Sequence, residues 1–251
     1  MKIRLADYVA NFLAEKGVTD VFSVVGGGAM HLNDALGHHE KLHVTYNHHE
    51  QACAIAAEAY ARLENKIAAV CVTTGPGGTN ALTGVVGGWL DSIPMFIISG
   101  QVRYDTTARY ALQYTGTPLR AMGDQEYDIV KSVSNMTKFA TMIEDPKQIR
   151  YALEKAWHLA TTGRPGPVWL DIPVNYQGGY DPENEDKIQQ GIAALTRGKT
   201  LLVIAHRLST IKNADNIVVL KEGRIEAQGT QAQLLETCPL YRTMWEAHIG
   251  A

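Results

Sequence analysis

The chain has 251 residues, and its 45% hydrophobic content is enough for a packed core in one large domain or two modest ones. The formal net charge of -3, from 23 basic and 26 acidic residues, excludes the one-sided field that nucleic acid or an anionic membrane surface would attract. The three cysteines, Cys53, Cys71 and Cys238, stand far apart in apolar segments, which predicts no disulfide framework or zinc site and favours a reducing cytoplasm.

Helices and strands are predicted to alternate along the first 180 residues. Apolar residues at helical spacing over 5–16 stop at Gly17, a residue suited to a left-handed cap, and indicate an amphipathic helix. Further on we expect strands over 21–25, 42–46, 67–73, 95–99, 139–143 and 168–172, and helices over 49–62, 79–90 and 146–162, with a polar, irregular stretch after residue 99. Such repeated β-α units with apolar strands predict an α/β fold, a doubly wound parallel sheet with helices on both faces.

The tail is predicted to form a small, incomplete α/β segment. We expect a helix from Asp181 to Gly198, a strand over 200–205, a short helix, strands over 217–220 and 224–227, and a final helical region capped by Thr230. The sequence changes character near residues 180–181, so we predict two domains, 1–178 and 179–251.

No signal peptide or membrane span is predicted. Asp7, Asn11 and Glu15 interrupt the region where a signal peptide needs an apolar run. The longest apolar region, 85–98, contains Asp91 and Pro94 and is too short and too broken to cross a bilayer.

Glu50 is the first residue that indicates chemistry. It opens a predicted helix directly after a predicted strand, which places it at the carboxyl end of the strand and near a helix N-terminus, where ligands of α/β sheets collect. A first-turn glutamate that only complements the helix dipole is the alternative, and Glu50 taken alone does not decide between the two.

Three motifs in register carry a family resemblance. They are NHHEQ at 47–51, GPGGTN at 75–80 and the run from Asp91 to Val102. Together they resemble the N-terminal pyrimidine-binding domain of thiamine diphosphate enzymes of the acetolactate synthase type, over about residues 1–178.

The resemblance implies a cofactor and roles for particular residues. Glu50 would hydrogen-bond a ring nitrogen of the aminopyrimidine of thiamine diphosphate and favour its imino tautomer, which removes the thiazolium proton. Pro76 and Asn80 would line the ring pocket, and Gly26 and Gly27 would form the first cofactor-binding glycine turn. Gln125 would reach toward the substrate, a 2-oxo acid such as pyruvate, although Asp124 stands where the family has an aromatic residue.

Two departures limit what the resemblance implies. The glycine turn reads VVGGG at 24–28, where biosynthetic acetolactate synthases carry an aromatic residue and a proline, so other carbonyl substrates stay open. Family members bind the diphosphate and Mg²⁺ through a Gly-Asp-Gly motif on a later domain, often across a subunit interface, and this chain contains no such motif. We therefore expect a homo-oligomer or a complementary diphosphate-binding domain as partner, and an isolated chain that is inactive.

Histidines are concentrated in the same region without forming a metal pattern. Six of the nine lie between His31 and His49, at spacings that match no metal site, so we interpret them as polar loop residues beside the pocket.

Residues 181–251 resemble the end of an exporter-type ATP-binding cassette ATPase domain. The resemblance rests on IAHRLST at 204–210, in which His206 matches the switch histidine that contacts the terminal phosphate. The phosphate loop, the signature sequence and the magnesium-binding strand are absent from the chain, and GKT at 198–200 reads as a helix cap followed by a strand. We therefore expect a vestigial site.

Three hypotheses follow from the sequence. The first is a thiamine diphosphate-dependent decarboxylase or carboligase domain that needs partners. The second is a non-catalytic chimera produced by gene fusion, by engineering or by an assembly error. The third, a transporter ATPase component, is disfavoured by the missing phosphate loop.

Overall fold

The computed structural model describes residues 3–179, 211, 214–221 and 223–249. By its internal contacts the chain divides into two compact units, 1–187 and 188–251. The expected helix over 181–198, the strand over 200–205 and His206 lie outside the described residues.

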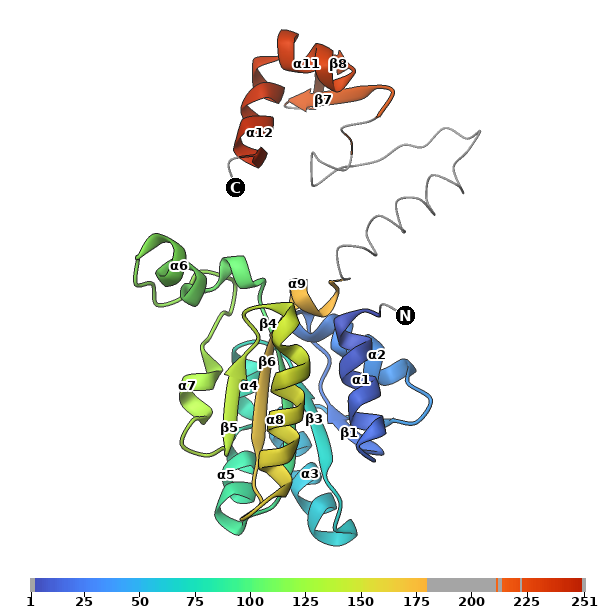
Figure 1. The fold of residues 1–251 in the computed structure, drawn as a ribbon, viewed down its shortest axis with the longest axis vertical. Helices are drawn as coiled ribbons and strands as arrows, with labels where there is room; N and C mark the ends of the chain where they lie inside the picture. The colour runs from blue at the N-terminus through green and yellow to red at the C-terminus, as the bar shows by residue number, and fades with distance from the viewer. Residues whose placement is uncertain (1–2, 180–210, 212–213, 222, 250–251) are drawn as a thin grey trace. The chain divides into compact units, whose positions relative to one another are not determined.

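The first unit alternates helices and strands along the chain (Figure 1). Its elements are α1 (Leu5–Glu15), β1 (Asp20–Ser23), α2 (Met30–His38), β2 (His43–Tyr46), α3 (Glu50–Glu64), β3 (Ala68–Val72), α4 (Pro76–Asn80), α5 (Leu82–Asp91), β4 (Met95–Gln101), α6 (Ala108–Thr115), α7 (Ile129–Val133), β5 (Phe139–Met142), α8 (Ile149–Thr161), β6 (Val168–Pro173) and α9 (Val174–Gln177). Single 3₁₀ turns cover Gly27–Ala29, Tyr104–Thr106 and Pro146–Gln148.

The strands form one six-stranded sheet in the order β2-β1-β3-β4-β6-β5, and neighbouring strands pair in parallel. The chain runs outward from β1 to β2 and then returns past β1 to β3, so the strand order reverses between β1 and β3. A crevice for ligands opens at such a reversal, beyond the carboxyl ends of the strands.

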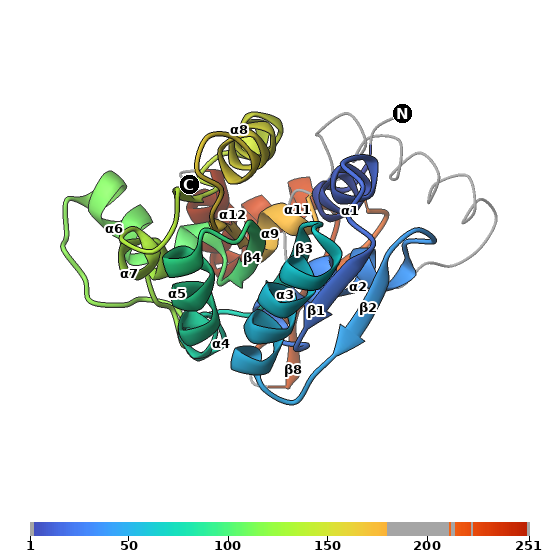
Figure 2. The same cartoon turned by 90° about the horizontal axis from the view of Figure 1, so that it is seen from below.

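Alternation along the strands divides the core into two halves. In β3, Ala69 and Cys71 join the core that α1, α2 and α8 cover, whereas Ala68, Val70 and Val72 join the core under α3 and α5. Figure 2 shows α1 and α8 on one side of the sheet and α3 and α5 on the other. The predicted doubly wound parallel sheet with helices on both faces is therefore confirmed.

The helices after the glycine loop differ from the prediction. The helix expected over 79–90 is two helices, α4 and α5, which meet at Ala81. The first begins early because Gly75 adopts a positive φ of 56° and Pro76 occupies the first helical position, which its ring favours. The stretch after residue 99 that was expected to be irregular contains α6 and α7, and α2 was not predicted.

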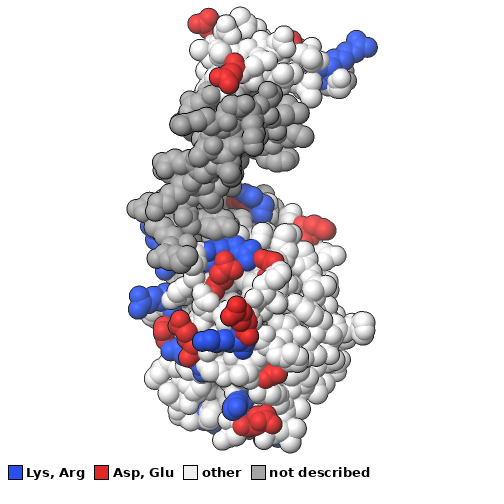
Figure 3. Space-filling model, turned by 90° about the vertical axis from the view of Figure 1, so that its right-hand side faces the viewer, with Lys and Arg blue, Asp and Glu red and all other residues white. Residues whose placement is uncertain are grey.

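The surface of the first unit carries no patch of one charge on the face drawn in Figure 3, where acidic and basic side chains are interleaved. Among its ion pairs, Arg4 contacts Asp7 and Asp34 at 2.7 Å each, and Lys16 contacts Glu154 at 2.9 Å. Among the described residues, none of the helices has the length and apolar character needed to cross a bilayer.

The second unit contains a hairpin and two helices among its described residues. Strands β7 (Ile217–Lys221) and β8 (Arg224–Gly229) pair antiparallel, and α11 (Gln231–Thr237) and α12 (Pro239–Ile249) follow. Leu234, Cys238 and Tyr241 are buried against the hairpin. The strands predicted over 217–220 and 224–227 are confirmed, and so is the Thr230 cap, since Thr230 and Gln233 form a reciprocal capping box.

Candidate functional site

A cleft of about 630 Å³ lies beyond the carboxyl ends of β1, β3 and β4, at the reversal of strand order. One side is formed by the glycine turn after β1 and by two threonines after β3. The rest of the lining comes from the segments after β4, around residues 102–106 and 122–125, and from Val174 after β6. The lining residues are Gly26, Gly27, Gly28, Thr73, Thr74, Val102, Arg103, Thr106, Met122, Gly123, Asp124, Gln125 and Val174.

The glycine turn packs directly onto the end of β3. A Cβ added at Gly26 would lie 2.4 Å from Thr73 Cβ, and one added at Gly28 would lie 1.9 Å from Thr74 Oγ1. Thr73 Oγ1 also accepts a hydrogen bond from the Gly28 amide at 3.1 Å. A Cβ at Gly27, in contrast, would meet no atom within 4 Å, so the middle of the turn faces open space. The two outer glycines therefore permit a close approach that larger residues would prevent.

Glu50 occupies the first position of α3, and the residue is only 9% exposed. The preceding residue, His49, caps the helix, because its Nδ1 accepts the Gln51 amide at 3.1 Å. Asn80 Nδ2 donates to Glu50 Oε2 at 3.0 Å, and a Cβ at Gly77 would lie 3.4 Å from Glu50 Oε1. A nearly buried carboxylate is thus held at a helix N-terminus beside a glycine loop, where it can accept hydrogen bonds from a flat polar ring.

Gln125 lines the cleft and has an unusual backbone conformation. Its φ is 57°, a conformation that disfavours residues with a Cβ atom. Gly75 faces it with a φ of 56°, and a Cβ at Gly75 would lie 2.1 Å from the Gln125 carbonyl oxygen. The glycine loop and the Gln125 loop therefore touch through their backbones.

The predicted site residues lie around two adjacent features. Glu50 and Asn80 are joined by a hydrogen bond, and Gly26, Gly27 and Gln125 line the cleft. Thr73 connects the two features, since it contacts both Gly26 and Gly77, while Pro76 is exposed and is not among the lining residues. Among the described residues, no group of three or more His, Cys, Asp or Glu side chains is arranged to hold a metal ion.

A buried polar network behind the cleft was not predicted. Asp171 in β6 is fully buried and accepts hydrogen bonds from Ser99 Oγ at 2.6 Å and from Gln101 Nε2 at 3.0 Å. Trp169 Nε1 donates to Ser99 Oγ at 2.7 Å. Burial raises the pKa of Asp171 to about 7, against the lowering effect of the two donors. The signal in the sequence was a single carboxylate inside an apolar strand.

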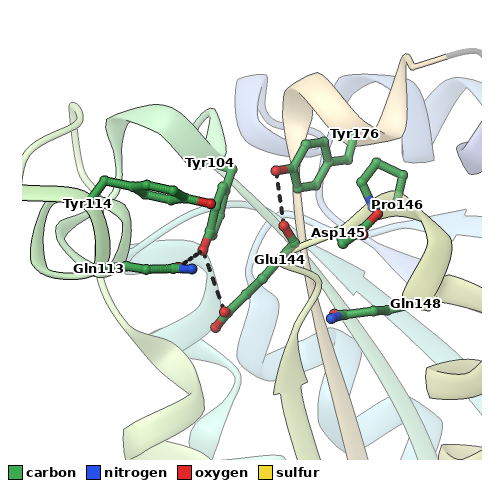
Figure 4. Close-up of a pocket in the computed structure, with 8 residues that line it drawn as sticks. All are labelled: Tyr104, Gln113, Tyr114, Glu144, Asp145, Pro146, Gln148 and Tyr176. Carbon is green, nitrogen blue, oxygen red and sulfur yellow. Dashed lines mark hydrogen bonds between the residues drawn. The ribbon is translucent and has the colours of Figure 1, made fainter. Parts of the chain in front are cut away.

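A second, smaller pocket of about 470 Å³ lies beyond the ends of β5 and β6 (Figure 4). Tyr104 and Tyr114 approach it from one side and Tyr176 from the other, with Glu144 between them. Tyr104 Oη donates to Gln113 Oε1 at 2.8 Å, and Tyr176 Oη donates to the Glu144 carbonyl at 3.1 Å. Burial, together with the nearby carboxylates, raises the pKa of Tyr104 and of Tyr176 to about 12, so both hydroxyls stay protonated and can donate.

Part of the chain is similar to a known protein family. Residues 3–119 match the family described as thiamine pyrophosphate enzyme, N-terminal TPP binding domain, a range that includes Glu50, Pro76 and Asn80 but not Gln125. The N-terminal part of the chain is similar in sequence to acetolactate synthases.

The relatives that support this are acetolactate synthases. The large subunit of Haemophilus influenzae is 36% identical over 172 residues, covering 68% of this chain and 28% of the relative. The chloroplastic enzyme of Arabidopsis thaliana is 35% identical over 175 residues, covering 68% and 24%. The isozyme 3 large subunit of Escherichia coli is 31% identical over 238 residues, covering 92% and 39%. The chain thus spans about a quarter to two fifths of the length of these relatives.

Proposed function

We propose that this chain supplies the aminopyrimidine-binding half of a thiamine diphosphate site for the decarboxylation or carboligation of 2-oxo acids. The observation that carries the proposal is the Glu50 carboxylate, nearly buried at the start of α3 and held by Asn80 beside the glycine loop. Bound thiamine diphosphate would supply a thiazolium carbon acid able to add to a 2-oxo acid.

The contribution of the protein in this proposal is a positioned hydrogen-bond acceptor. Glu50 would accept a hydrogen bond at a carboxylate oxygen from the protonated ring nitrogen that faces it and so favour the imino tautomer, and a low-dielectric environment would strengthen that hydrogen bond. The Asn80 amide fixes the other carboxylate oxygen and so sets the direction in which Glu50 accepts. The glycines at 26 and 77 support the fit of a flat ring, because side chains there would collide with Thr73 and displace the loops.

Pro76 and Gln125 complete the proposed site in different ways. Pro76 fixes the start of α4 and thereby the path of the glycine loop. Gln125, which lines the cleft, offers a side-chain amide that can donate to a substrate carboxylate or carbonyl.

The same proposal includes a partner and a compartment. Groups for the diphosphate and its Mg²⁺ would come from a complementary domain or a second subunit, because this chain lacks the diphosphate-binding motif. A cytoplasmic location is supported by Cys53, Cys71 and Cys238, which are buried free thiols.

The experiment restores the missing part. Residues 1–173 are joined to the downstream domains of a full-length acetolactate synthase, and turnover of pyruvate is measured with thiamine diphosphate and Mg²⁺. Glu50→Gln should lower the rate by at least about a hundredfold, the lower range of general acid-base contributions. The matched control is Glu64→Gln at the exposed end of the same helix, which should have little effect.

Two results bear on the proposal directly. The unmodified chain should show no carboligation under the same conditions, because half of the cofactor has no ligands. Near-full activity of the Glu50→Gln hybrid would remove the glutamate from the mechanism and leave a resemblance of fold alone.

For the tail we propose only the weaker reading of an ATP-binding cassette remnant, as part of a chimeric chain. It is supported by the sequence run at 204–210, which lies outside the described residues. The Escherichia coli relative, which aligns over 92% of the chain, weighs against a join to an unrelated protein. Because the chain has no phosphate loop, calorimetric titration should detect no micromolar, magnesium-dependent ATP binding, and detection of it would contradict the vestigial reading.

A further inference from the structure

One wall of the cleft is formed by the two ends of a single protruding segment. Residues 102–106 leave β4 along the cleft, α6 follows, and the chain returns to the cleft at residues 122–125. Figure 1 shows α6 standing away from the sheet. Because a protruding segment cannot rely on the core to hold it, its position depends on a few specific contacts.

Glu126 joins the two ends of this segment. The residue is only 7% exposed, so its carboxylate needs hydrogen-bond partners within the protein. One oxygen, Oε1, accepts the amide of Ala108 at the start of α6 at 3.0 Å. The other, Oε2, accepts the amide of Met122 at 2.7 Å. A single buried carboxylate therefore fixes both the outgoing and the returning strand of chain.

We call the two hydrogen bonds from Ala108 and Met122 to Glu126 the Glu126 clamp. Gln125 precedes Glu126 in the chain and has a disfavoured backbone conformation. With a φ of 57° it occupies the left-handed region, which residues with a Cβ atom rarely adopt unless their surroundings impose it. On its other side, Gln101 Nε2 donates to the Tyr127 carbonyl at 2.9 Å and holds the chain after Glu126. Buried side chains therefore hold the residues before and after Gln125, and the Glu126 amide donates to the Gly123 carbonyl at 3.2 Å across it.

Other contacts hold the outer part of the segment but do not reach Gln125. Arg109 donates to Asp128 through Nε and Nη2 at 3.0 and 2.9 Å and to Glu144 through Nη1 at 2.9 Å. Tyr104 adds a contact to Gln113 inside the second pocket (Figure 4). These groups attach α6 to the start of α7 and to Glu144 after β5, whereas Glu126 accepts backbone amides from both ends of the segment.

We propose that Glu126 is a positioning residue that holds Gln125 in its left-handed conformation and so directs the Gln125 amide into the cleft. The inference rests on the proposed function only for the task given to Gln125. The mechanical part, that Glu126 imposes the backbone of Gln125, stands on the geometry of this chain.

The mechanical part is tested by urea unfolding of the full chain. Gln125→Gly removes the conflict between a Cβ atom and a positive φ, and should lower the equilibrium constant for unfolding about fivefold. In a chain that also carries Glu126→Gln, the loop is already released, and the same change should alter the constant by less than about twofold. Ala108→Pro is a second way to cut the clamp: it removes one donor, and proline suits the first position of α6.

The control is another residue, outside this segment, that has a Cβ atom and a positive φ. Asn65 ends α3 with a φ of 52°, so Asn65→Gly should stabilise the wild type and the Glu126→Gln chain by equal factors. An equal benefit of Gln125→Gly in both backgrounds would overturn the proposal, because Gln125 would then owe its conformation to other contacts.

A spectroscopic signature separates positioning from general stability. The ¹³Cα and ¹³Cβ shifts of Gln125 report its backbone angle in the folded chain, and they should leave the left-handed range in Glu126→Gln and Ala108→Pro but not in Glu50→Gln.

The functional part uses 4-amino-5-hydroxymethyl-2-methylpyrimidine, the ring half of the cofactor, as the probe. Binding of this probe should be lost in Glu50→Gln and kept in Glu126→Gln, whereas the response of the Gln125 side-chain amide to added pyruvate should be lost in both.

These outcomes keep the two proposals apart. Absence of probe binding to the wild-type chain would count against the proposed function, while the backbone shifts would still decide the role of Glu126. Unchanged Gln125 shifts in both clamp variants would overturn the further inference even if the probe binds.

Discussion

Asp171 should make the folding stability of the first unit depend on pH in an unusual direction. Its carboxyl group is fully buried in β6, and burial raises its pKa from 3.8 to about 7, although Ser99 and Gln101 donate to it. As pH rises through this window, the unfolded chain releases the proton first and the folded chain keeps it. The folded state then binds more protons, so the free energy of unfolding falls between about pH 4 and pH 7.

The size of this fall follows from the same values. The distance between 3.8 and about 7 on the pH scale corresponds to on the order of 4 kcal/mol for one group. Asp171→Asn keeps the shape and cannot titrate, so it removes this contribution. The variant should match the wild type to within about 1 kcal/mol near pH 4, where the carboxyl is also neutral, and should become the more stable protein as pH approaches 8.

The assay is urea unfolding between pH 4.5 and 8, followed by tryptophan fluorescence, since Trp169 lies in the same network. The exposed Glu40→Gln serves as the control and should leave the shape of the pH profile unchanged. Wild-type and Asp171→Asn profiles that run parallel over the whole range would refute the reasoning, because they would mean that Asp171 is ionised in the fold at all these pH values.

Three further predictions concern other parts of the structure and are tested by unfolding in urea. Gly75→Ala should cost at least about 2 kcal/mol, because it combines a positive φ with a Cβ placed 2.1 Å from the Gln125 carbonyl, whereas Gly27→Ala should cost less than about 1 kcal/mol; equal costs would contradict the packing of the two loops. Trp169→Phe should cost at least about 1 kcal/mol through the lost bond to Ser99, and a larger loss at high pH than at low pH would tie that bond to the Asp171 charge. Thr230→Ala should destabilise α11 by about 1 kcal/mol, with a drop in the helical circular dichroism of the tail, and unchanged helicity would mean that the capping box contributes little.

The fold was predictable because its signals are local and repeated. Apolar strands of four to seven residues are separated by helical periods, and Gly17 does end α1 with a positive φ of 84°. The segment after β4 was not predictable in this way. Its helices α6 and α7 are short, and α6 is held by Arg109 through partners 19 and 35 residues away, which no local pattern reveals.

The candidate site was predicted only where a short motif carried it. Glu50 and Asn80 stand in sequence motifs, and the structure joins them with a hydrogen bond that the motifs did not state. Glu126 and Asp171 were missed as functional residues because their meaning depends on distant donors: the amides of Ala108 and Met122 for one, and Ser99 and Gln101 for the other. Their roles in the site stay predictions.

The strand order determines when the sheet can be completed during translation. Strand β5 pairs with β6 and not with β4, and β6 is the last strand of the sheet to be synthesised. Until residues 168–173 leave the exit tunnel, the side of β4 away from β3 stays unpaired and β5 has no neighbour, which leaves two open edges on a growing chain. The sheet is therefore completed when β6 inserts between β4 and β5. Any pause in translation before β6 would lengthen the time in which nascent chains can associate through the unpaired edges.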